Sequence, residues 1–223
     1  MWQALFDELK SLGFVVLAVA MDHAEAARPW IEAAKPEYPC LIDRDHHVAD
    51  LYNLVNVPQA VWIDEQGRIV RPPENAGSTD GFRAMNRSTA TMSPEIIDER
   101  NRVKALYSNA LRDWARNGAK SVHVLDAARA TSRLIPKDPA IAQAHAHFRL
   151  GQYLLREGRK DEAQAQFAQA IALHPESWNI WRQTADKNPT GLAAGPDFWA
   201  RVDALGERPY HRPIDMEGVL AGA

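Results

Sequence analysis

The sequence predicts an α/β domain followed by an all-α domain. In the first third of the chain, candidate helices alternate with short apolar segments, which is the order typical of an α/β sheet. A stretch rich in proline and glycine, residues 72–81, then ends this alternation. Beyond it, apolar residues recur at helical spacing over long segments. These three observations place the domain boundary near residue 80.

The α/β part is expected to run helix, strand, helix, short strand, helix and hairpin, which makes its sheet mixed. The apolar run Phe14–Ala20 is typical of a strand buried on both faces. Gly67 closes a four-residue turn between two apolar runs, which indicates a hairpin. The expected elements are helices at 2–12, 25–35 and 45–54 and strands at 14–20, 38–43, 59–63 and 68–71.

The helical part is expected to begin with a long helix. Ser93 and Pro94 supply an N-cap and a first-turn proline, and Gly118 supplies a stop. Together these patterns predict an α/β domain at 1–80, a helical domain at 81–195 and an irregular tail at 196–223. Further helices are expected at about 121–134, 139–157, 160–173 and 176–187.

Composition excludes several function classes. Apolar residues make up 46% of the chain, charged residues 25%, and the net charge is −3, so no nucleic-acid partner is expected. The longest apolar run, Phe14–Met21, is too short to cross a bilayer. No signal peptide is visible. The chain as given is therefore expected to be cytoplasmic, or periplasmic or extracytoplasmic if it is part of a longer protein.

The first 72 residues resemble the thioredoxin-like superfamily, in its redoxin branch that includes thiol reductases of the TlpA/ResA kind. The most specific part is the pattern Tyr-x-x-x-x-Val-Pro followed by Ile-Asp-x-x-Gly-x-Ile-Val, which runs from Tyr52 to Val70. This resemblance implies a thioredoxin-like fold and thiol–disulfide chemistry. The matching segments are residues 5–22, 38–43, 51–58, 61–64 and 67–70.

The chain departs from this family at its redox site. Family members carry Cys-x-x-Cys at the start of the helix whose later part matches residues 2–12, after a first strand that this sequence lacks. Cys40 is the only cysteine, so dithiol exchange within one chain is excluded. Cys40 is the one catalytic candidate for peroxidatic or mixed-disulfide chemistry. Its apolar neighbours favour a buried thiol that acts as a small hydrophobe.

Pro58 precedes an apolar run that predicts a strand. A proline at a strand start is compatible with a trans peptide bond and no further role. The family resemblance implies instead a cis proline that leaves neighbouring backbone groups free to pair with an extended peptide. On this interpretation Asn56, Val57 and Pro58 are the candidate binding residues.

Residues 144–177 resemble one tetratricopeptide repeat. Leu150 and Gly151 fall at its seventh and eighth positions, and the spacing of the later positions fits the 34-residue helix-turn-helix pattern. The small residues allow two helices to approach closely. The resemblance implies binding of a protein or peptide, while a purely structural helix pair is the alternative. The remaining matching positions are Ala163, Phe167, Ala170 and Pro175.

No cofactor or metal motif is found. Carboxylates and imidazoles cluster after two predicted strands, where sites gather in α/β sheets, but their spacing matches no known ligand set. The sequence predicts no cofactor and no metal, and it leaves four weak metal candidates, which are Asp22, His23, Asp43 and His46.

Three functions follow from the sequence. The first is a redoxin-like protein that acts by binding a protein or peptide. The second is a thiol–disulfide oxidoreductase or peroxidase that uses Cys40 or cysteines upstream. The third is an unrelated activity, such as metal-assisted hydrolysis, on the same scaffold. Because the first strand is missing, we also expect the tail or a second copy in a homodimer to cover the open sheet edge.

Overall fold

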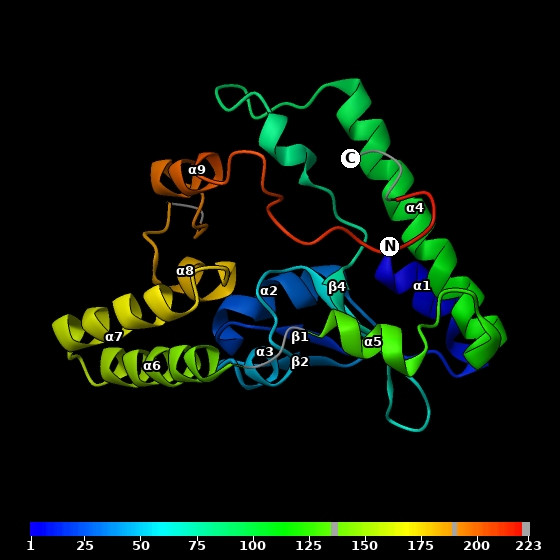
Figure 1. Ribbon diagram of the computed structural model, residues 1–223, viewed down its shortest axis with the longest axis horizontal. Coiled ribbons are helices and arrows are strands. Elements are labelled where there is room, and N and C mark those ends of the chain that lie inside the picture. The colour runs from blue at the N-terminus through cyan, green and yellow to red at the C-terminus, as the bar shows by residue number, and fades with distance from the viewer. Residues whose placement is uncertain (135–137, 189–190, 220–223) are drawn as a thin grey trace. The chain divides into compact units, whose positions relative to one another are not determined.

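The computed structural model describes residues 1–134, 138–188 and 191–219 (Figure 1). The chain forms two compact units, and each unit is built from two separate stretches. Unit 1 comprises residues 1–57 and 135–193, and unit 2 comprises residues 58–134 and 194–223. The domain boundaries that the sequence predicts, after residues 80 and 195, differ from the boundaries of these units and stay a prediction.

Unit 1 begins with the α/β segment. Two three-residue strands, β1 (Ala18–Ala20) and β2 (Cys40–Ile42), pair in parallel, with Ala18 opposite Cys40. Gly13 adopts a φ of 84° and ends the first helical stretch, as the sequence predicts. The helices of this segment are α1 (Trp2–Leu9), η1 (Lys10–Leu12), α2 (Ala24–Ala34) and α3 (His47–Tyr52).

The strand expected over Phe14–Ala20 is shorter than predicted. Only residues 18–20 pair, and the preceding side chains of Val15 and Leu17 are 59% and 63% exposed. An apolar run becomes a strand only where a neighbouring strand satisfies its backbone, and β2 offers three residues. In the described residues, the segment 196–219 contributes a strand to neither sheet. Coverage of the β1 edge by a second copy stays a prediction.

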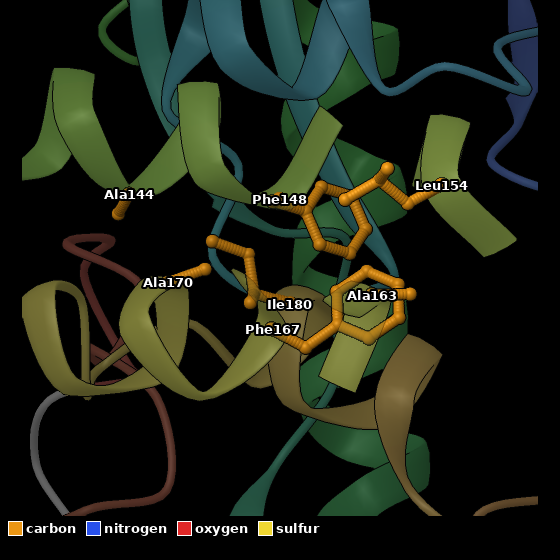
Figure 2. Packing of buried hydrophobic residues seen from close by; sticks show 7 residues of the cluster. All are labelled: Ala144, Phe148, Leu154, Ala163, Phe167, Ala170 and Ile180. Atoms are coloured by element: carbon orange, nitrogen blue, oxygen red, sulfur yellow. The ribbon is translucent and has the colours of Figure 1, made fainter. Parts of the chain in front are cut away.

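Unit 1 continues with three helices, α6 (Pro139–Arg156), α7 (Lys160–Leu173) and α8 (Trp178–Thr184). Asp138 and Ser177 cap α6 and α8 by accepting hydrogen bonds from the amides of Ile141 and Ile180. Figure 2 shows how Phe148 of α6 and Phe167 of α7 meet, with a ring centroid separation of 5.9 Å. The buried cluster comprises Ala144, Phe148, Leu154, Ala163, Phe167, Ala170 and Ile180.

Unit 2 contains the predicted hairpin. β3 (Gln59–Ile63) pairs antiparallel with β4 (Ile69–Asn75), and Gly67 in the turn has a φ of 74°. β4 runs through Pro72 and Pro73, which the sequence suggested as part of a domain exit. The register shifts between Ala60 and Trp62, so the prolines fall at an irregularity where no regular ladder bond is needed.

The longest helix also belongs to unit 2. Ser93 caps α4 (Pro94–Asn117), and Gly118 follows it, which confirms the predicted start and stop. Against β3, the Trp62 indole N–H donates to the Tyr107 hydroxyl at 2.8 Å and its ring stacks on Trp114 at 4.9 Å. The other helices of unit 2 are η2 (Asp80–Ala84), η3 (Gly118–Lys120), α5 (Ala127–Arg133) and α9 (Pro196–Asp203).

The α/β-plus-helical fold class is confirmed, with one difference. The expected mixed sheet is present as a parallel pair and an antiparallel pair that are separate sheets in the described part of the chain. None of the helices within the described ranges is both long and apolar enough to cross a membrane.

Gly151→Ala is expected to destabilise unit 1. A Cβ at residue 151 would lie 2.5 Å from Cε1 of Phe167, and such overpacking costs about 1–3 kcal/mol. The higher helix propensity of alanine offsets about 1 kcal/mol of that cost. Urea unfolding followed by circular dichroism measures the difference. The control is Gly195→Ala, where an added Cβ meets nothing within 4 Å. An unchanged midpoint for Gly151→Ala would contradict the close approach of α6 and α7.

Candidate functional site

An open hollow of about 380 Å³ lies where β1 and β2 end and α2 and α3 begin. Of the groups that line it, Asp45 makes two ion pairs. Asp45 contacts Arg44 at 2.9 Å and Arg156 of α6 at 3.1 Å. The hydrogen bond from Arg44 keeps the pKa of the Asp45 carboxyl below its usual value, partly offset by desolvation. The lining residues are His23, Ala24, Glu25, Ile42, Asp43, Arg44, Asp45 and His47.

Asp43, one of the weak metal candidates, caps α3. Its side chain is buried, with Oδ1 accepting a hydrogen bond from the His47 amide at 2.8 Å. Oδ2 accepts two more, from the amides of Val48 at 2.9 Å and Ala49 at 3.2 Å. These three donors are amides of the first helical turn that the helix itself cannot satisfy. Both carboxylate oxygens are therefore used to hold the start of α3.

His46, another candidate, is part of the packing of unit 1. The residue is 3% exposed and has a φ of 57°, in the left-handed region. Its ring lies edge-on to Phe148 of α6, with centroids 5.0 Å apart. Burial lowers the pKa of His46, and the carboxylates of Asp43 and Asp22 oppose that shift in part. The neutral imidazole is therefore the form that this site favours.

The other two metal candidates do not complete a ligand set. His23 is exposed at the start of α2, and its amide donates to Oδ1 of Asp22 at 2.7 Å. Within residues 1–134, 138–188 and 191–219, no group of three histidine, cysteine or acidic side chains lies close enough to hold a metal ion. Asp43 caps α3 and His46 packs against α6, so the four candidates do not form a set of metal ligands in the described residues.

Cys40 lies on β2 and is half-buried, where the sequence favoured full burial. Its Sγ lies 3.8 Å from the carbonyl oxygen of Tyr38, a contact in which the S–H is the donor. Reactive cysteines sit beside cationic groups or helix N-termini that stabilise the thiolate. The Tyr38 carbonyl oxygen is not a cationic group, so this contact supplies no such stabilisation.

The three candidate binding residues differ in exposure. Asn56 is buried, with 2% of its surface exposed, while Val57 is 46% exposed and Pro58 is also exposed. The Pro58 carbonyl accepts a hydrogen bond from the Ala76 amide at 3.4 Å, beside the first residue pair of the hairpin. Exposed apolar side chains at Val57 and Pro58 are available for contact with a partner. The cis state of Pro58 stays a prediction.

A set of polar contacts, which we call the polar seam, joins the α/β segment to the helices within unit 1, and no motif in the sequence predicts it. Arg149 of α6 pairs with Asp50 of α3 at 2.5 Å, and His174 contacts Asn53 at 3.3 Å. Asn179 of α8 donates two hydrogen bonds, from its backbone amide and its side chain, to carbonyl oxygens of the loop that follows α3. Those bonds are Asn179 N to Val55 O at 3.0 Å and Nδ2 to Leu54 O at 2.6 Å.

One apolar stripe of α6 faces away from the buried cluster. Leu150 and Tyr153 are 45% and 49% exposed, and Ala142 and Ala146 are exposed on the same side. These four residues recur at intervals of three and four, so they share one face of the helix. The buried residues of α6, such as Phe148, occupy the opposite side. We call Ala142, Ala146, Leu150 and Tyr153 the outer α6 stripe.

His46→Asn is expected to reduce the sensitivity of unit 1 to mild acid. Because burial lowers the pKa of His46, the unfolded chain takes up a proton first as the pH falls below about 6.5, and stability is lost until the folded form is also protonated. Asparagine tolerates a positive φ and does not titrate. Thermal unfolding at pH 7.5 and 5.5 should show a smaller drop for the variant.

The exposed neighbour supplies a matched control for this measurement. His47→Asn removes a histidine that is exposed at the first position of α3, so it should retain the drop seen in the wild-type protein. Equal drops in the wild type and in both variants would show that His46 is not the group responsible.

Comparison with known families agrees with this architecture. Residues 1–71 match the AhpC/TSA family, and residues 144–177 match the tetratricopeptide repeat. No curated protein and no solved structure matches the chain. The expected thioredoxin-like and tetratricopeptide-like segments are thereby confirmed, the second with the same bounds. The chain joins a thioredoxin-like redoxin segment of the AhpC/TSA type to a tetratricopeptide repeat.

Proposed function

We propose that this protein binds a protein or peptide partner and does not itself carry out dithiol exchange. The outer α6 stripe is the observation that carries the proposal. It presents exposed Leu150 and Tyr153 on a repeat of a type that commonly binds other proteins. The exposed residues Val57 and Pro58 supply a second contact for an extended peptide. The motif at residues 52–70 favours the TlpA/ResA-type branch for the redoxin segment.

The polar seam supports a binding role for the repeat. α3 and the loop after it contact α6, His174 just after α7, and α8 through Asp50, Asn53 and Val55. These contacts hold residues 1–57 of the redoxin segment and the repeat in one compact unit. A rigid pair of helices loses little conformational entropy when it binds, because its backbone is already ordered. The outer α6 stripe is therefore a preorganised surface.

A thiol-dependent activity is the second candidate. Cys40 is free and half-buried, so an oxidant or a disulfide could reach it. Its Sγ contacts the Tyr38 carbonyl, whereas reactive cysteines sit beside cationic groups or helix N-termini. Metal-assisted hydrolysis is not proposed, because Asp43 and His46 already hold and pack α3.

Leu150→Arg and Val57→Arg are expected to weaken peptide binding. Peptides selected from a random phage-displayed library on the wild-type protein should bind each variant about tenfold or more weakly, because a buried arginine without a partner costs well over 1.4 kcal/mol. Fluorescence anisotropy with the selected peptides measures the change. Val122→Arg is the control, since Val122 is 83% exposed and lies in unit 2. Equal peptide affinities in the wild type and all three variants would exclude both surfaces as the peptide-binding site.

Cys40→Ser is expected to leave any disulfide-reducing or peroxide-consuming turnover unchanged from the wild type, at background. Titration of the native thiol should be slow near neutral pH and complete after denaturation, because the side chain is partly buried. Rapid reaction of native Cys40, with turnover that the serine variant loses, would favour the second candidate over binding.

A further inference from the structure

The segment at residues 206–219, drawn in red in Figure 1, is packed within unit 2 without belonging to a helix or sheet. We call it the tail segment. Three of its apolar side chains are nearly fully buried, with exposures of 6% for Tyr210, 1% for Ile214 and 4% for Met216. Buried backbone must find hydrogen-bond partners. The tail segment finds many of its partners in side chains of other elements.

Four side chains donate hydrogen bonds to five carbonyl oxygens spaced along the tail segment. They come from β4, η2 and α4, which lie far from it in sequence. The Asp80 carboxylate adds one acceptor, for the Tyr210 amide at 2.6 Å. The donations are Arg83 to Gly206 at 2.6 Å and Arg208 at 2.9 Å, Asn75 to Arg212 at 3.3 Å, Arg71 to Asp215 at 2.9 Å, and Arg102 to Gly218.

An acidic side chain adds a second kind of contact. The Asp215 carboxylate pairs with Arg133 of α5, and Arg129 lies 3.4 Å from the same oxygen. Arg71 is 1% exposed and remains bonded to Glu74 and to the His123 carbonyl, so it does not depend on the tail segment alone. Six side chains thus form what we call the tail-binding surface, namely Arg71, Asn75, Arg83, Arg102, Arg129 and Arg133.

This pattern is that of peptide recognition. Donors aimed at successive carbonyls hold an extended chain whatever its sequence, while apolar anchors and a paired carboxylate select among sequences. We propose that the tail-binding surface is a peptide-binding site occupied by the chain's own tail segment. Its exchange partner is an extended peptide of a second protein with the spacing aromatic-x-x-x-aliphatic-acidic-Met, which Tyr210, Ile214, Asp215 and Met216 display.

The tethered occupant has a thermodynamic advantage over a free peptide. An intramolecular ligand on a short connection acts at an effective concentration of about 1 mM. A free peptide with the same contacts therefore competes poorly until the tethered segment is weakened. This site uses residues of unit 2, so it is independent of the outer α6 stripe and goes beyond the function proposed above.

The test uses the full chain with its own tail segment weakened. Asp215→Lys places a cation beside Arg129 and Arg133 and should release the tethered segment. The probe is a fluorescein-labelled peptide, Gly-Glu-Arg-Pro-Tyr-His-Arg-Pro-Ile-Asp-Met-Glu-Gly-Val, which copies residues 206–219. Fluorescence anisotropy should show binding to the Asp215→Lys protein about tenfold or more tighter than to the wild type, because charge-assisted hydrogen bonds are lost only in the tethered segment.

Two controls separate the site from a general charge effect. Glu217→Lys makes the same change of charge two residues away, at an exposed side chain, and should bind the probe as weakly as the wild type does. A probe with alanine in place of Ile214 and Asp215 should bind the Asp215→Lys protein about tenfold more weakly than the native probe. Folded Asp215→Lys protein that binds neither probe, or both equally, overturns the proposal.

If Asp215→Lys fails to fold, hydrogen exchange of the wild-type protein tests whether the tail segment can leave the tail-binding surface. An exchangeable occupant opens locally, so the amides of the tail segment should exchange at least tenfold faster than the slowest amides of α4. Tail amides that exchange only with global unfolding overturn the proposal, because the segment is then a fixed part of the fold.

Discussion

The carboxylate of Asp43 holds the first turn of α3, and much of unit 1 depends on that arrangement. Its two oxygens accept hydrogen bonds from three successive amides. The helix start so defined places His46 against Phe148 and Asp50 beside Arg149. Those contacts fix residues 1–57 of the redoxin segment on the helices of the repeat. A residue that looks like a candidate ligand in the sequence therefore holds the start of the helix that contacts the repeat.

The sequence predicts correctly those features that depend on residues close to one another in the chain, such as helix ends and the helix pair. The spacing at residues 144–177 predicts the helix pair, because Gly151 must lack a side chain where Phe167 crosses it. Ser93 and Gly118 likewise mark the ends of α4. The strand over Phe14–Ala20 was predicted too long, since its length depends on a neighbour elsewhere in the chain. The continuation of β4 through Pro72 was missed for the related reason that a bulge removes the need for its amide.

Long-range polar contacts leave no pattern in the sequence. Arg149 and Asn179 look like ordinary surface residues of helices, yet they bind α3 and the loop that follows it. Arg71 lies beside a candidate turn and is 1% exposed, held by Glu74, His123 and Asp215. A single sequence records periodicity and caps, but it does not record which distant carbonyl a guanidinium will meet. For the same reason the apolar neighbours of Cys40 predict a buried thiol, whereas the residue is half-buried and the next two residues of its strand are exposed.

The division of each unit into two distant stretches also governs when the protein can fold during synthesis. Residues 1–57 lack the partners of their seam until α8, which ends at Thr184, has left the ribosome. Residues 58–134 wait longer, for α9 and the segment after it. Contacts between such distant stretches pay a loop-closure entropy before they stabilise anything, which slows folding. The nascent chain therefore carries the polar residues of α3 and the loop after it without their partners until α6 and α8 are made, and incompletely packed stretches of this kind are prone to aggregation.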